Sequence, residues 1–129
     1  MRDAVASIQP QRRSIAIVIS DGADRNSSMT TAAALQKVAQ SKLTVYSLLL
    51  GGGSGAEFLG AAADRTGGTA VSSSADRVAA DLGRIMDDIN SRYVAVYQSR
   101  GTTRGWREIQ LIPRSGIQIA TSRRGYYAE

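Results

Sequence analysis

Ser20, Asp21 and Gly22 follow a short apolar run, and a second carboxylate, Asp24, comes soon after them. A carboxylate at the end of a buried parallel strand lies where open α/β sheets place their ligands. Asp21, with Ser20 and Asp24 as further oxygen donors, is therefore a candidate site for Mg²⁺ or Mn²⁺. Asp-Gly is also a common turn dipeptide, so the alternative is that Asp21 only makes an Asx turn.

A second candidate site is the glycine-rich stretch that contains Gly51 and Gly53 and ends at Ala56. Its Gly-x-Gly-x-x-Ala spacing, between a predicted strand and a predicted helix, is typical of loops that bind a dinucleotide. Asp76 lies about twenty residues further on, the usual distance to the acidic residue that contacts the ribose. The alternative interpretation is a plain strand-to-helix loop, with Asp76 at the start of a later helix.

The composition excludes most catalytic chemistry. The 129 residues include no cysteine and no histidine, which removes thiol nucleophiles, zinc–thiolate sites and Ser-His-Asp relays. Only oxygen ligands remain for a metal ion. We therefore do not expect an ordinary hydrolase.

The formal net charge of +5 arises in the C-terminal part of the chain. Residues 92–129 contain seven arginines and only two acidic residues. A basic segment can attract phosphate backbones, so a nucleic-acid-binding accessory protein is an alternative function. Arginines on alternating strands also form a solvated face, and no aromatic RNA-binding pattern accompanies these, so nucleic acid is not the expected partner. The arginines are Arg92, Arg100, Arg104, Arg107, Arg114, Arg123 and Arg124.

The first 91 residues alternate between two hydrophobic patterns. Short runs rich in β-branched residues predict buried parallel strands: Ser14–Ser20, Leu43–Leu50 and Thr69–Ser72.

Helical spacing predicts a helix capped by Ser28, with Ala32, Leu35, Val38 and Ala39 on its apolar face. A second helix is predicted over residues 56–66, on Phe58, Leu59, Ala62 and Ala63, and is stopped by Gly67 and Gly68. A capping box of Ser73 and Asp76 predicts a third, with Val78, Leu82, Ile85, Met86 and Ile89 on its apolar face.

Beyond residue 92 the apolar residues alternate with period two, which predicts strands: Tyr93–Gln98, Trp106–Ile112 and Ile117–Thr121. Turn residues 113–116 predict that the last two strands form a hairpin. The fold class that we expect is α/β: a parallel sheet with helices on both faces, followed by a C-terminal antiparallel β-hairpin extension.

Taken in order, several segments resemble the C-terminal half of a von Willebrand factor type A (VWFA) domain, most narrowly the VWFA-related domain proteins of acidobacteria. The segments are SIAIVISDGADRNS, LTVYSLLLGGG, DRTGGTAVSSSADRVAADLGRIMDDINSRYVAVY and SRRGYYA. The likeness runs from about residue 2 to residue 128. It implies a Rossmann-like fold, with residues 1–98 as the half-domain and residues 99–129 as a basic β-hairpin extension packed on or extending the same domain.

The resemblance implies a non-catalytic adhesion module that binds a protein. In such domains three loops hold Mg²⁺ or Mn²⁺ in a metal-ion-dependent adhesion site, and a carboxylate of the partner completes the coordination. Asp21 corresponds to the ligand from the third loop. The D-x-S-x-S motif of the first loop does not occur in this sequence, so we expect a truncated fragment with an incomplete site that holds no metal tightly.

The resemblance also implies that the N-terminal strands of the domain are missing, which would leave the strand ending at Asp21 with an unpaired edge. We expect that edge to pair with a partner or with another copy of the chain. Residues 1–13 lack the apolar core of a signal peptide, and no apolar run is long enough to span a membrane. Members of the family are often exported, so the compartment of this chain stays open.

Overall fold

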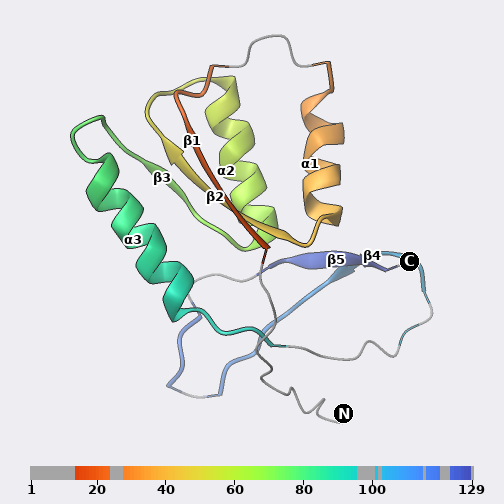
Figure 1. Ribbon diagram of the computed structural model, residues 1–129. Helices are drawn as coiled ribbons and strands as arrows, with labels where there is room; N and C mark the ends of the chain where they lie inside the picture. Colours follow the sequence, from red (N-terminus) through yellow and green to blue (C-terminus); the bar gives the residue numbers. More distant parts are fainter. Residues whose placement is uncertain are drawn as a thin grey trace.

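The computed structural model describes residues 14–23, 28–95, 101, 103–114, 116–119 and 123–128. Within these ranges the chain forms five strands and three helices (Figure 1). In chain order they are β1 (Ser14–Ser20), α1 (Thr31–Gln40), β2 (Leu43–Leu49), α2 (Ser54–Thr66), β3 (Ala70–Ser72), α3 (Val78–Ser91), β4 (Gly105–Glu108) and β5 (Gly125–Ala128).

The first three strands form a parallel sheet in the order β1-β2-β3. β1 pairs with β2 along its whole length, with Ser14 opposite Leu43 and Ser20 opposite Leu49. In Figure 1, α1 and α2 lie on one side of this sheet and α3 lies on the other. The expected α/β class, with a parallel sheet and helices on both faces, is confirmed.

Two apolar clusters hold the helices on the sheet. On one face, Val45 of β2 packs with Leu35 of α1 and Ala62 of α2. On the other face, Tyr46 and Leu48 pack with Ile85 of α3. These two sets alternate along β2, as the period of a strand requires, and β2 is buried on both faces because it is the middle strand.

β1 is less buried than its sequence predicts. We expected burial on both faces, but the side chains of Ile17 and Ile19 are 38% and 49% exposed. The cluster under α3 is centred on β2 and takes in only Ile15 from β1. The expectation fails because β1 is an edge strand on the described part of the sheet, and α3 packs mainly on β2 and reaches only Ile15 of β1.

Two predicted helix starts are wrong. α1 is capped by Thr30, whose hydroxyl accepts a hydrogen bond from the N–H of Ala33, and not by Ser28. Ser73 and Asp76 form no capping box, because the residue before α3 is Arg77 and no side chain caps this helix. The hydroxyl of Ser73 instead donates to the carboxylate of Asp81, at 2.8 Å, one turn inside α3.

The predicted faces of the three helices hold in part. In α1 Leu35 and Ala39 are buried, whereas Ala32 is exposed. In α3 Ile85 is buried, whereas Met86 is 43% exposed. The predicted stop of α2 is confirmed, since Gly67 ends the helix in the left-handed conformation with a φ of 79°.

The C-terminal strands pair differently from the predicted hairpin. β4 is antiparallel to β5, with Trp106 opposite Tyr127. Close to the predicted turn, the N–H of Ile117 donates a hydrogen bond to the carbonyl of Arg114. Neither residues 117–119 nor residues 93–95 are strand, and the remainders of those two predicted strands, 120–121 and 96–98, lie outside the described residues.

Among the described residues, no helix is both long enough and apolar enough to cross a membrane.

Candidate functional site

Asp21 lies in a tight turn at the carboxyl end of β1. Its Oδ1 accepts a hydrogen bond from the N–H of Ala23, at 3.0 Å, which is the Asx turn of the alternative interpretation. The hydroxyl of Ser20 accepts from the N–H of Gly22, at 3.1 Å. Asp21 is exposed. Asp24 lies outside the described residues.

The described residues do not make a complete metal site. They contain no cluster of three or more acidic side chains that could hold an ion. Near the end of β1 they offer the Asp21 carboxylate, one oxygen of which is engaged in the turn, and the Ser20 hydroxyl. Mg²⁺ and Ca²⁺ sites in proteins ordinarily use several preplaced oxygens. The described donors alone do not make such a set, and the third candidate, Asp24, is outside the described residues.

The glycine-rich loop lies directly against the Asp21 turn. The N–H of Leu50 donates to the carbonyl of Ser20 at 2.8 Å, and the N–H of Gly55 donates to the carbonyl of Gly22 at 3.2 Å. A Cβ on Gly51 would come within 2.7 Å of the Asp21 carbonyl oxygen. The two stretches that the sequence offers as separate candidate sites are thus one place, at the carboxyl ends of β1 and β2.

The loop is poorly prepared to bind a pyrophosphate. Free N–H groups at a helix N-terminus are what bind phosphate. At the start of α2, however, the N–H of Gly55 is used by Gly22, and those of Ala56 and Glu57 donate to the carbonyl of Gly53. Asp76 is engaged locally as well, since a hydrogen bond from the Ser74 side chain lowers the pKa of its carboxyl.

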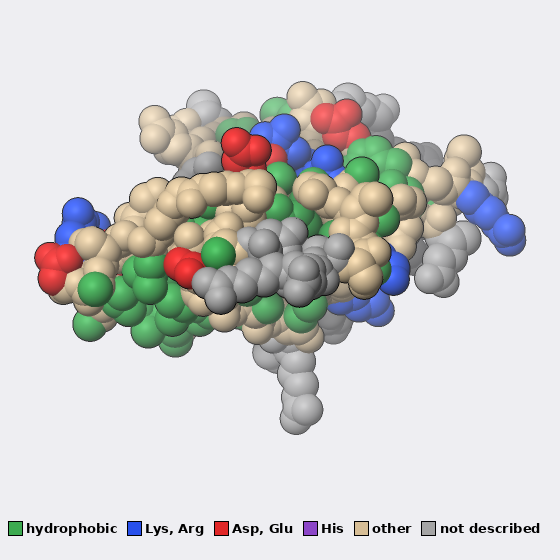
Figure 2. All heavy atoms as spheres, turned by 90° about the horizontal axis from the view of Figure 1, so that it is seen from above, with side chains coloured by type: hydrophobic (Ala, Val, Ile, Leu, Met, Phe, Trp, Pro, Cys, Tyr) green, Lys and Arg blue, Asp and Glu red, His purple; other side chains and the backbone are tan. Residues whose placement is uncertain are grey.

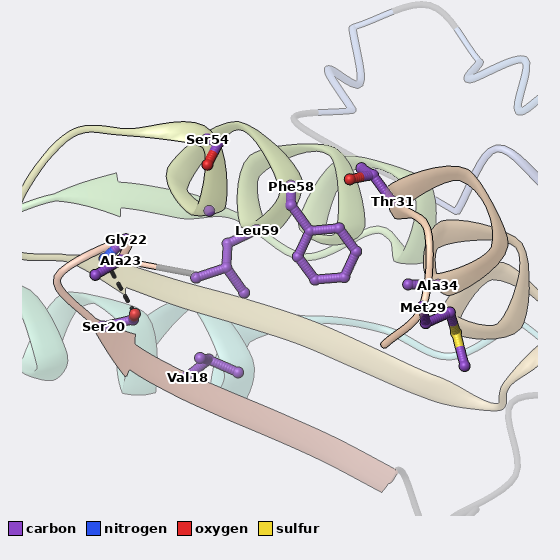
Figure 3. A pocket seen from close by; sticks show the side chains of 11 residues that line it. Val18, Ser20, Gly22, Ala23, Met29, Thr31, Ala34, Ser54, Phe58 and Leu59 are labelled. Atoms are coloured by element: carbon purple, nitrogen blue, oxygen red, sulfur yellow. Dashed lines mark hydrogen bonds between the residues drawn. The ribbon is translucent and has the colours of Figure 1, made fainter. Parts of the chain in front are cut away.

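A pocket of about 280 Å³ opens beside this place, between β1, α1 and α2 (Figure 3). Phe58 and Leu59 project into it from α2, and Ala34 borders it from α1. None of the lining residues has a titratable side chain. They are Val18, Ser20, Gly22, Ala23, Met29, Thr31, Ala34, Ser54, Gly55, Phe58 and Leu59.

Sequence reasoning missed the pocket. It assigned Phe58 and Leu59 to the apolar face of a helix, which is correct, but the same side chains also line the opening. The opening depends on how closely the Asp21 turn approaches α2, and that approach depends on the absence of a side chain at Gly55. Gly55 was the available signal. It stands inside the glycine-rich stretch, which was considered only as a dinucleotide-binding loop or a plain strand-to-helix loop.

Figure 2 looks onto the carboxyl ends of the parallel strands. Backbone and uncharged side chains make up most of this face, and the acidic and basic groups are scattered over it. Every buried side-chain nitrogen or oxygen among the described residues has a hydrogen-bond partner. The described part of the chain thus leaves no buried polar atom to be satisfied by a cofactor.

Arg92, the first of the C-terminal arginines, is engaged inside the fold. Its Nε donates to the Asp88 carboxylate at 2.8 Å, and its guanidinium also bonds to the carbonyl of Gly67. The guanidinium stacks over the ring of Tyr46, at 5.3 Å from the ring centre. Since the Tyr46 hydroxyl donates to Asp88 as well, Arg92 completes a network between α3 and β2.

Arg123 and Arg124 attach the two-stranded sheet to the helices. Arg123 donates to the carbonyl of Ala39, at 2.8 Å, and to that of Ser41, both at the end of α1. Burial in this position lowers the pKa of Arg123 from its usual value. Arg124 forms an ion pair with Asp64 of α2, at 3.0 Å. Both arginines therefore make contacts within the chain, and Arg124 remains largely exposed.

Comparison of the chain with protein-family models, with curated proteins and with solved structures finds no match.

Proposed function

We propose that the chain is a non-catalytic protein-binding module of the von Willebrand A type, and that its contact surface is the pocket together with the Asp21 turn. The observation that carries the proposal is the chemistry of the pocket. Its lining combines apolar side chains with the hydroxyls of Ser20, Thr31 and Ser54, and it contains no acid, base or nucleophile stronger than a hydroxyl. The exposed Asp21 lies beside it.

The arrangement of the elements supports this proposal. The parallel order β1-β2-β3, with two helices on one face and one on the other, is compatible with the Rossmann-like fold that the resemblance implies. Asp21 follows β1 at the sheet edge where open α/β sheets carry their ligands. The surface is therefore placed where a module of this type would use it.

The size of the pocket indicates what it would take. At about 280 Å³ it lies just below the range of roughly 300–1,000 Å³ for small-molecule sites. A dinucleotide would exceed it, whereas one large apolar side chain of a partner would fill it. We propose that the partner inserts such a side chain between Phe58 and Ala34 and places a polar group near Asp21.

The dinucleotide alternative is not favoured by the contacts at the start of α2. A bound pyrophosphate would have to displace the hydrogen bond between Gly55 and Gly22, which also joins the two loops. Losing that hydrogen bond would destabilise the folded protein. The same geometry is consistent with a preformed, rigid rim for an apolar side chain.

NMR titration of the methyl-labelled protein tests the proposal. The probe is a short, blocked peptide with one leucine, and the controls are the same peptide with glycine in place of leucine and NAD⁺. We expect the leucine peptide to shift the methyl signals of Val18, Ala34 and Leu59, and both controls to leave them unchanged. Shifts produced by NAD⁺ alone would support the dinucleotide alternative, and shifts confined to other residues would contradict the proposed surface.

A further inference from the structure

The outer edge of β1 carries backbone groups without a described partner. The Ser20 carbonyl accepts from Leu50, so residues of β1 with the same parity as Ser20 direct their N–H and C=O groups toward β2. Those of Ile15, Ile17 and Ile19 point the other way. No strand among the described residues pairs with that edge. Protected edges carry charges, prolines or bulges, and β1 has none of these.

Apolar side chains border the same edge. Ile17 and Ile19 are exposed on the face of the sheet that α3 covers only in part. On α3, Asp81 contacts Ser73 next to β3, so the helical period puts Met86 on the opposite flank, toward β1. Met86 is also exposed. In Figure 2, hydrophobic side chains gather at the left of the view, on the side where α3 lies.

The sequence of β1 is nearly the same in both directions. Ser14–Ser20 reads SIAIVIS, and its reverse differs only by the exchange of Ala16 and Val18. Two copies placed antiparallel about Ile17 therefore put like residues opposite each other. In the sequence, a basic residue, Arg13, precedes the strand and an acidic residue, Asp21, follows it.

We infer that the outer edge of β1 binds β1 of a second copy of this chain, antiparallel and about a two-fold axis at Ile17. In this register Ile17 faces Ile17 of the second copy and Ile15 faces Ile19. Each of these pairs exchanges both of its backbone hydrogen bonds, because these are the residues whose groups point outward. Their side chains form one isoleucine row across the joined sheets. The contact is isologous and closes on itself as a dimer.

This pairing does not depend on the proposed function, since it uses neither the pocket nor Asp21. Sedimentation velocity and backbone amide exchange on the full chain test it without any substitution. We expect the 13.7 kDa chain to form a dimer as its concentration rises. The amides of Ile15, Ile17 and Ile19 should become protected over the same concentration range, while that of Val18, which faces β2, is protected throughout.

A charge exchange at the two-fold axis tests the register. Ile17→Lys and Ile17→Glu each place like charges opposite each other, and we expect each to weaken dimerisation at least tenfold. An equimolar mixture of the two variants should dimerise again. Ile112→Lys is the matched control, because Ile112 is an exposed isoleucine that does not belong to β1, and it should leave the dimer unchanged.

A chain that stays monomeric at every concentration overturns the inference. So does concentration-independent protection of the Ile17 amide, which would mean that the same chain covers the edge. A dimer that survives in both separate Ile17 variants, or a mixture that fails to restore it when both variants fold, assigns the interface to another surface or register. If either variant unfolds, the concentration dependence of amide exchange in the unsubstituted protein still tests the inference.

Discussion

The backbone N–H of Gly55 donates a hydrogen bond to the carbonyl oxygen of Gly22 at 3.2 Å. This contact joins the turn after β1 to the first turn of α2, and it forms one wall of the pocket. A Cβ on Gly55 would lie 2.5 Å from the same carbonyl oxygen. The two loops can approach this closely only because residue 55 has no side chain.

We expect Gly55→Ala to destabilise the protein by about 1–3 kcal/mol, because the new methyl group forces the Gly22 carbonyl away. Urea unfolding followed by circular dichroism measures this. Gly83→Ala is the matched control: Gly83 lies in α3 with nothing within 4 Å of a built Cβ, and it should stabilise by up to about 1 kcal/mol. Equal effects of the two substitutions would contradict the close approach.

Thr66 links α2 to the middle strand. Its hydroxyl accepts from the N–H of Val45 at 2.9 Å and donates to the Ala62 carbonyl at 2.8 Å, and the side chain is fully buried. Thr66→Val leaves the Val45 N–H unsatisfied, so we expect a loss of about 1–3 kcal/mol in the free energy of unfolding. The exposed Thr103→Val should change it by less than about 0.5 kcal/mol. If Thr66→Val leaves the free energy of unfolding unchanged, water or another group replaces the hydroxyl.

Asp81 is the buried acidic residue of α3, with its side chain 1% exposed. It accepts from Ser73 at 2.8 Å and pairs with Arg84 at 3.2 Å. Asp81→Ala removes the acceptor from both partners, and we expect it to cost about 1–3 kcal/mol in chemical denaturation. Asp87→Ala, at an exposed position of the same helix, should be neutral or slightly stabilising. If Asp87→Ala had the lower denaturation midpoint of the two variants, the stabilising role of the Asp81–Ser73 contact would be refuted.

Divalent metal should bind this chain weakly. Among the described residues Asp21 is the one carboxylate at the end of β1, so we expect dissociation constants on the order of 10⁻⁴–10⁻³ M or weaker for Mg²⁺ and Mn²⁺. Asp21→Asn is the useful variant, because its amide oxygen can keep the Asx turn to Ala23 while the charge is lost. Calorimetric titration showing micromolar affinity that Asp21→Asn abolishes would mean that further ligands complete the site.

The parallel sheet could be predicted because short stretches of the sequence indicate each of its main elements. β-branched runs mark β1 and β2, and the glycines after α2 stop that helix where expected. The starts of α1 and α3 were harder to predict. Ser28 and Thr30 are both acceptable caps for α1, and Ser73 is an acceptable cap for α3, so the residue type alone does not identify the cap. Thr30 caps α1, and Ser73 is taken by Asp81.

The C-terminal pairing could not be predicted from alternation alone. Residues 117–121 and 125–128 are both short and partly apolar, and a period of two does not say which of them pairs with β4. The choice follows from packing: Trp106 stacks edge-on against Tyr127, with ring centres 5.1 Å apart. Gly125 leaves room for this, since a Cβ there would lie 2.5 Å from the Trp106 ring.

The candidate site shows the same limit. Asp21 was placed correctly at the end of β1, but the pocket arises from two loops that are remote in sequence. Its apolar part includes Phe58 and Leu59 of α2, which were predicted only to lie on the apolar face of a helix. The site therefore needed the fold before its chemistry could be stated.

The central proposal is tested most directly by filling the pocket. Ala34→Phe puts a ring into it from α1, whereas Ala32→Phe puts the same ring on an exposed position of that helix outside the lining. In the NMR titration with the leucine peptide, we expect Ala34→Phe to abolish the shifts at Val18 and Leu59 and Ala32→Phe to preserve them. Binding that persists unchanged in a folded Ala34→Phe protein would show that the pocket is not the contact surface.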